Sequence, residues 1–193
     1  SWAVACRDIA RSTDERTFIA SVVPSLAIPN TAKVVFLTND QIPLTPCLVA
    51  NFASIVFDFV ARQKIGGIHM SGFIVEQLPV VPPHTYGAAA PWEPKLSLQG
   101  WLLPRLLELV YTAWDLEPFA RDVGYDGPPF RWHPDRRFLL RAELDAAFFQ
   151  IYGLSRDDTC YVLDTFPIVR KNDEKAHSEY RTQRVLLEIY DAL

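Results

Sequence analysis

The feature that most constrains the fold is an amphipathic helical pattern over residues 45–64, followed by two glycines and a proline-rich stretch. Thr45 and Pro46 are typical of a helix N-terminus. Apolar residues then recur at helical spacing, at Leu48, Val49, Phe52, Ile55, Val56, Phe59 and Val60. One face of this helix must therefore be buried. The pattern predicts one continuous helix, which Gly66 closes in the left-handed conformation.

Short apolar runs on either side of this helix predict strands. The runs at 18–23 and 33–37 are β-branched and are separated by turn residues. A third run, at 73–81, contains Pro79 and is followed by Pro82 and Pro83. Because proline cannot donate to a β-ladder, this third strand is expected to be an edge or a terminating strand, not a central one.

The second half of the chain reads as helical. Residues 84–100 are rich in Pro, Ala and Gly and lack periodicity, which predicts a boundary. Helices are expected from Pro104, from Asp115 to a stop at Gly124, from Pro134 to a cap at Gly153, from the capping box at Ser155, and from Asn172 to the end. Trp114 and Phe148 are expected in the core. The predicted class is α+β, with a mixed α/β domain at 1–85, a linker at 86–100 and a helical subdomain at 101–193.

Composition limits the classes of function. The chain has 193 residues and a net charge of −4, so any contact with nucleic acid must come from a local basic patch. Cys6, Cys47 and Cys160 are odd in number and far apart, which argues against a disulfide framework and favours a cytoplasmic location. No apolar run reaches the ~18 residues of a membrane span. The chain opens on Ser1 and contains only Met70, so we expect a piece of a longer protein.

No catalytic or metal-binding motif is evident. The four histidines lack ligand spacing, and no glycine-rich loop for phosphate is present. The segment 127–130, Gly-Pro-Pro-Phe, resembles half of an amino-methyltransferase motif but has glycine where an acceptor side chain is needed. We therefore predict no catalytic residue, no metal and no cofactor within these residues.

Recognition is the function that remains. Hydrogen-bonding residues and glycines surround the turn after the amphipathic helix, where they suit phosphates and base edges: Arg62, Gln63, Lys64, Gly66, Gly67, His69 and Ser71. For the glycines, a helix cap with a tight turn is an equally good interpretation. A second cluster comprises Arg7, Arg11 and Arg16; since acidic residues lie among them, an ion-paired surface is the alternative. A third cluster either binds phosphates or docks a neighbouring domain: Arg131, Arg136, Arg137 and Arg141.

Several segments carry a resemblance to a known family. They are 7–9, 13–17, 19–24, 51–83, 111–119, 141–158, 164–170 and 179–182. In their order they resemble the C-terminal target-recognition region of type IIG restriction-modification enzymes and of the adenine-specific DNA methyltransferases of phage-exclusion systems. The helix, glycine turn and proline-ended strand also resemble the recognition domains of type I restriction specificity subunits.

The resemblance implies a specificity fragment that grips double-stranded DNA. It also implies an upstream methyltransferase domain, which binds S-adenosylmethionine, in the same polypeptide. The fragment itself is then not an enzyme. The alternative is a helical docking module of the same defence system with little DNA contact, which the acidic balance favours. The DNA sequence read, cleavage by the parent and the oligomeric state are left open.

Overall fold

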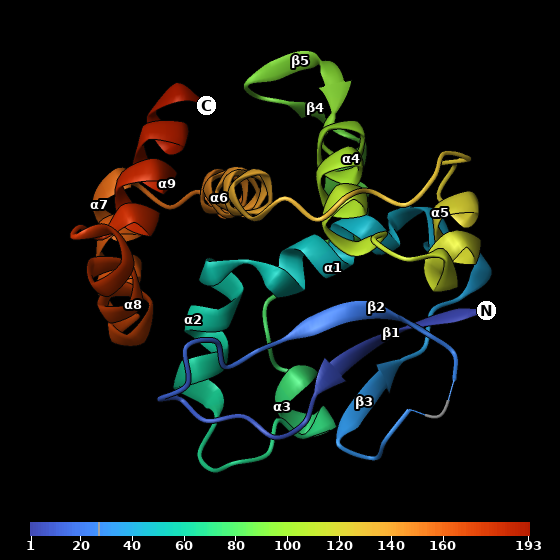
Figure 1. The fold of residues 1–193 in the computed structure, drawn as a ribbon, viewed down its shortest axis with the longest axis horizontal. Helices are drawn as coiled ribbons and strands as arrows, with labels where there is room; N and C mark the ends of the chain where they lie inside the picture. Colours follow the sequence, from blue (N-terminus) through green and yellow to red (C-terminus); the bar gives the residue numbers. More distant parts are fainter. Residues whose placement is uncertain (27) are drawn as a thin grey trace.

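The computed structural model describes residues 1–26 and 28–193 and has an α+β fold (Figure 1). Its larger sheet has the order β2-β1-β3, formed by β1 (Trp2–Arg7), β2 (Ala20–Pro24) and β3 (Ala32–Val35). Both outer strands run antiparallel to β1, and Val4 lies opposite Val22 and Val35. The two predicted strands are present, whereas the central strand was missed, because its alanines have low strand propensity and pairing on both sides stabilises it.

The predicted continuous helix is wrong, because the chain breaks at Ser54. A 3-10 turn, η1 (Asn39–Leu44), leads into α1 (Thr45–Ala53), which is followed by α2 (Ile55–Lys64) after a bend of 63°. The N–H of Ile55 donates to Oδ1 of Asp145 at 2.7 Å instead of continuing the helix. Ser54 caps α2, since its side chain accepts from the N–H of Phe57.

The strand predicted at 73–81 is also wrong. The structure has a single helical turn, α3 (Gly72–Val75), and then irregular chain up to η2 (Pro83–Gly87). Its backbone forms turn hydrogen bonds up to Leu78, and two of its later polar groups bond to side chains. The N–H of Val81 donates to Oδ1 of Asn51, and the carbonyl of Pro79 accepts from the hydroxyl of Tyr152.

The segment predicted as a linker has regular structure. After η2 it forms a hairpin of β4 (Ala89–Ala90) and β5 (Glu93–Ser97) and then enters α4 (Leu98–Val110). Pro104 lies inside α4 and does not begin it, which corrects the predicted start. The side chain of Ser97 caps this helix by accepting from the N–H of Gly100.

The helices after α4 are η3 (Trp114–Leu116), α5 (Glu117–Asp122), α6 (Pro134–Ile151), α7 (Arg156–Asp164), α8 (Pro167–His177) and α9 (Arg181–Ala192). Those up to α7 follow the prediction. The stops at Gly124 and Gly153 are confirmed, because both have positive φ, and so is the capping box at Ser155. The single final helix is wrong: Ser178 adopts the left-handed conformation and separates α8 from α9.

The core joins the sheet to the helices. The larger cluster of buried side chains includes Val4 and Val22 of the sheet together with Leu102 of α4 and Phe148 of α6. Phe148 is thus confirmed as core, whereas Trp114 is 62% exposed and the expectation for it is wrong. A smaller cluster lies between the sheet and α2, and comprises Cys6, Ala10, Phe18, Phe52, Phe57, Ala61, Ile65, Met70 and Leu78.

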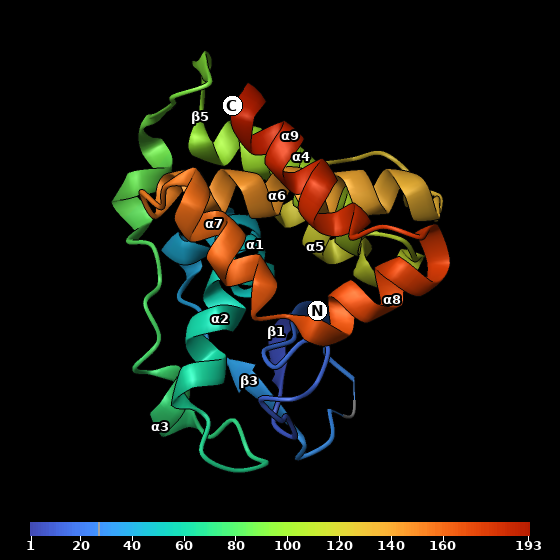
Figure 2. The ribbon, with the colours of Figure 1, turned by 90° about the vertical axis from the view of Figure 1, so that its left-hand side faces the viewer.

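The elements divide between two ends of the molecule. The sheet and α3 lie at one end, and α4, α6 and the β4–β5 hairpin lie at the other, in both views (Figures 1 and 2). Helix α9 packs on α6, α7 and α8. Among the described residues no single helix is long and apolar enough to cross a membrane, although residues 39–53 and 55–64 together meet that length and composition as a bent pair.

Candidate nucleic-acid interface

The turn after α2 lies at the sheet end of the molecule and faces outward. Gln63, Lys64, Gly66, Gly67 and His69 are all exposed. The segment 63–71, which we call the tip, connects α2 to α3 near the lower edge of Figure 1. The tip therefore presents donors and acceptors to solvent at one extremity of the protein.

Backbone contacts hold the tip to the chain that follows β1. The N–H of Ala10 donates to the carbonyl of Ile68 at 3.0 Å, and the N–H of Met70 donates to the carbonyl of Asp8 at 2.6 Å. Met70 is fully buried beneath this pair of segments. Nδ1 of His69 lies 2.9 Å from Oδ2 of Asp8, while most of the imidazole is exposed. The tip is thus a fixed loop whose outer surface carries both polar groups and the exposed Ile68.

The glycines of the tip leave open space. A Cβ added at Gly66 or Gly67 would meet no atom within 4 Å. Neither residue has positive φ, so the predicted left-handed cap at Gly66 is wrong. The helix ends instead at Ile65, which is extended and buried in the smaller core cluster. The absence of side chains at these two positions permits close approach of another molecule to the backbone.

Arg62 lies inside the protein. Its guanidinium donates to the carbonyls of Ser12, Asp14 and Glu15 at 3.1, 2.6 and 2.7 Å. It also lies 4.1 Å from the ring centre of Phe166, and the residue is 9% exposed. Burial lowers the pKa of this guanidinium. Arg62 therefore anchors the loop 11–16 from within.

The cluster Arg7, Arg11 and Arg16 is largely ion-paired. Arg16 pairs with the fully buried Asp58 at 2.9 Å, and Arg7 pairs with Asp14 at 3.2 Å. Both oxygens of Asp58 also accept from the backbone at 17–18. Arg11 is exposed, and within residues 1–26 and 28–193 its side chain has no such partner. Among the residues that the structure describes in this region, Arg11 and the exposed Lys64 are therefore the cations free to meet a phosphate.

Exposed apolar side chains lie in and beside the tip, and the sequence analysis does not identify them. Ile9, Ile68 and Phe73 are 47%, 51% and 75% exposed. Ile9 lies beside the tip because it forms an isolated β-bridge with His69. The sequence analysis places Phe73 in a strand, and nothing in the local sequence indicates that its side chain is exposed. Ser71, which immediately precedes α3, is half-buried and makes no side-chain cap bond.

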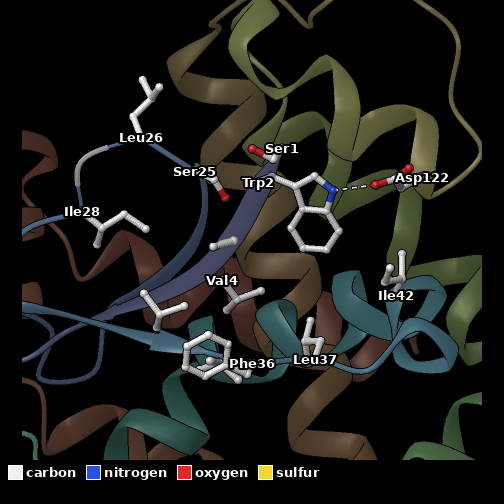
Figure 3. Close-up of a pocket in the computed structure, with 13 residues that line it drawn as sticks. Ser1, Trp2, Val4, Ser25, Leu26, Ile28, Phe36, Leu37, Ile42 and Asp122 are labelled. Carbon is white, nitrogen blue, oxygen red and sulfur yellow. Dashed lines mark hydrogen bonds between the residues drawn. The ribbon is translucent and has the colours of Figure 1, made fainter.

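An open apolar groove of about 690 Å³ lies beside β1 and β3 (Figure 3). Phe36 and Leu26 on its rim are 91% and 78% exposed. Nε1 of Trp2 donates to Oδ2 of Asp122 at 2.7 Å, which ties β1 to α5. Among the described residues that line the groove, Asp122 is the one with an ionisable side chain, and most of the others are apolar.

The described residues contain no group of three or more His, Cys, Asp or Glu side chains placed to hold a metal ion. Cys6, Cys47 and Cys160 all carry free thiols. Burial raises the pKa of Cys47 to about 12, so this thiol is not a nucleophile.

Comparison with known proteins gives no relative: no protein-family model, curated protein or solved structure matches the chain.

Proposed function

We propose that this chain reads the sequence of double-stranded DNA through the tip, as the specificity part of an adenine-specific DNA methyltransferase or restriction-modification polypeptide. An upstream domain of that polypeptide would bind S-adenosylmethionine and carry out the methyl transfer. The observation that carries the proposal is the tip itself, which is exposed, hydrogen-bond-rich and anchored by backbone bonds to the chain after β1.

Each part of the tip has a physical role in this proposal. Lys64 and Arg11 supply charge for phosphates, which sets affinity but not sequence preference. Gln63, His69 and Ser71 supply donors and acceptors for base edges. Gly66 and Gly67 let the backbone approach the duplex. Arg7, Arg16 and Arg62 hold the supporting loop in place through Asp14 and Asp58.

The proposal is tested with labelled duplexes and point variants of the chain. Lys64→Ala should weaken binding severalfold on every duplex sequence and lower the salt slope by about one phosphate contact, because one cation is lost. Lys95→Ala is the matched control, since Lys95 is exposed on β5 at the other end of the molecule. If the two substitutions weakened DNA binding equally, the tip would not be part of the DNA interface.

Sequence reading is tested separately in the full-length parent. Substitution of His69 or Gln63 by alanine should change which genomic sites carry methylated adenine, as measured by sequencing the methylated DNA. Unchanged sites after both substitutions would contradict direct readout by the tip.

A second candidate is docking of a partner polypeptide, favoured by the apolar groove beside β1 and β3 and by the net charge of −4. Phe36→Glu should then weaken association of this chain with the rest of the parent polypeptide, supplied separately, whereas Lys64→Ala should not. Calorimetric titration of the two pieces distinguishes these outcomes.

A further inference from the structure

A second cavity lies where the sheet half of the chain meets the helical half. It has a volume of about 170 Å³, is partly open to solvent, and is lined by residues of β2, α1, α4 and α6. Apolar side chains form much of its wall, namely Val49, Leu106, Leu109, Val110 and Leu144. Arg137 and Arg141 of α6 also line it. A partly open apolar cavity thus has two arginines in its wall, of which Arg137 is half-buried and Arg141 is exposed.

These two arginines differ from most arginines of the protein. Most of the others form ion pairs with carboxylates. Within residues 1–26 and 28–193, neither Arg137 nor Arg141 has a side-chain hydrogen bond or an ion pair, and Nη1 of Arg137 is buried without a partner. The guanidinium of Arg137 instead lies over the ring of Trp132, 3.7 Å from its centre. This contact holds the cation in place and leaves donors unused.

The charges around the cavity favour an anion. Arg137 and Arg141 are four residues apart and share one face of α6. Burial, and then the charge of Arg141, lower the pKa of Arg137. Glu108 opposes this effect, but both its oxygens bond to Arg136, at 3.0 and 3.1 Å. The cavity wall also contains Asp145, so two cations face one carboxylate.

The size of the cavity sets the size of the ligand. An apolar protein cavity of about 150 Å³ accommodates a benzene molecule. The apolar wall here can therefore hold one ring, with an attached anionic group directed to the arginines. Guanidinium groups bind carboxylate and phosphate through paired N–H donors.

We propose that this cavity binds a small organic anion, a ring-sized apolar body carrying one phosphate or carboxylate, with the body against Leu106, Leu109 and Val110 and the anion on Arg137 and Arg141. The site lies apart from the tip and does not depend on DNA recognition there.

The test is calorimetric titration of the chain with phenyl phosphate, with inorganic phosphate as the comparison ligand. Phenyl phosphate should bind saturably and at least tenfold more tightly than inorganic phosphate. Arg137→Ala and Arg141→Ala should each weaken it at least tenfold. Arg156→Ala is the control and should change binding less than twofold, because Arg156 is an exposed arginine of α7 that pairs with Asp191 and does not line the cavity.

A further variant keeps the test independent of the arginines. Ala53 is exposed and lines the cavity, so Ala53→Leu should obstruct the ring while both cations remain. It should abolish the preference for phenyl phosphate over inorganic phosphate. Circular dichroism confirms that each variant is folded before its titration is compared.

Three results would overturn the proposal. The first is no saturable binding of phenyl phosphate to the unaltered chain. The second is an equal loss of binding in Arg156→Ala and Arg137→Ala, and the third is displacement of phenyl phosphate by a short DNA duplex. The last result would assign the arginines to the DNA backbone.

Discussion

Single charged residues in this protein mostly hold chain segments together. Asp58 is fully buried, yet it accepts hydrogen bonds from two backbone N–H groups and pairs with Arg16. Arg62 bonds to three carbonyls of the loop 11–16. A buried charge is stable only when it is paired and hydrogen-bonded in this way. Of the basic residues that the sequence suggests for DNA contact, some are therefore held in ion pairs and hydrogen bonds within the protein, and others remain available to a ligand.

Asp145 makes the stability of the protein depend on pH. Burial raises the pKa of this carboxyl to about 6, from about 3.9 in an unfolded chain. The carboxyl is protonated in both states below the lower value and ionised in both above the higher one. Its contribution to stability is therefore lost as pH rises from about 4 to about 6, by on the order of 3 kcal/mol.

Asp145→Asn should remove this dependence while keeping an oxygen for the N–H of Ile55. The free energy of unfolding of the variant, relative to the unaltered chain, should rise between pH 4 and pH 7. Urea unfolding followed by circular dichroism measures it at both values. Asp135→Asn is the control, since that carboxylate is exposed. A difference that does not change with pH would contradict the raised pKa.

Elements are shaped by contacts from distant parts of the chain. The spacing of apolar residues over 48–60 fits a helix, and both α1 and α2 are helical. The break between them depends on Asp145, which lies 90 residues away and takes the N–H of Ile55. The resulting bend sets the direction of α2 and so the position of the tip.

The cap at this break is testable. Ser54→Ala should lower the free energy of unfolding by about 1 kcal/mol, because the N–H of Phe57 loses its side-chain acceptor. Ser71→Ala is the matched control, since Ser71 precedes α3 without a side-chain cap bond, and it should change stability by less than about 0.5 kcal/mol. Urea midpoints of the two variants give the comparison, and equal losses would show that the Ser54 bond adds nothing.

The whole molecule has a core that crosses the boundary predicted at 86–100. Val4 and Val22 of the sheet and Phe148 of α6 belong to one cluster of buried side chains. Because the sheet half buries part of its apolar surface against the helical half, we expect the two halves to unfold together.

Phe148→Ala tests this expectation, since Phe148 is fully buried in the shared cluster. The substitution should lower the free energy of unfolding by about 3–5 kcal/mol. Hydrogen exchange followed by mass spectrometry should show equal loss of protection in β1 and in α9. Faster exchange in α9 with unchanged exchange in β1 would mean that the halves are separate folding units.

Local patterns in the sequence determined the elements whose signals lie within a few residues. The span of α6, the glycine stops after α5 and α6, and the capping box of α7 all follow from local backbone and side-chain bonding. The exposure of the tip also agrees with its polar, glycine-rich composition.

Only the tertiary structure decided the features that depend on distant partners. The central strand β1 pairs with two neighbours, the break at Ser54 needs Asp145, and the irregular segment at 79–81 bonds to Asn51 and Tyr152. The burial of Arg62 and the free donors of Arg137 have the same origin. Spacing along a chain predicts which face is apolar, whereas the partner of a buried polar group is set by the residues that folding brings beside it.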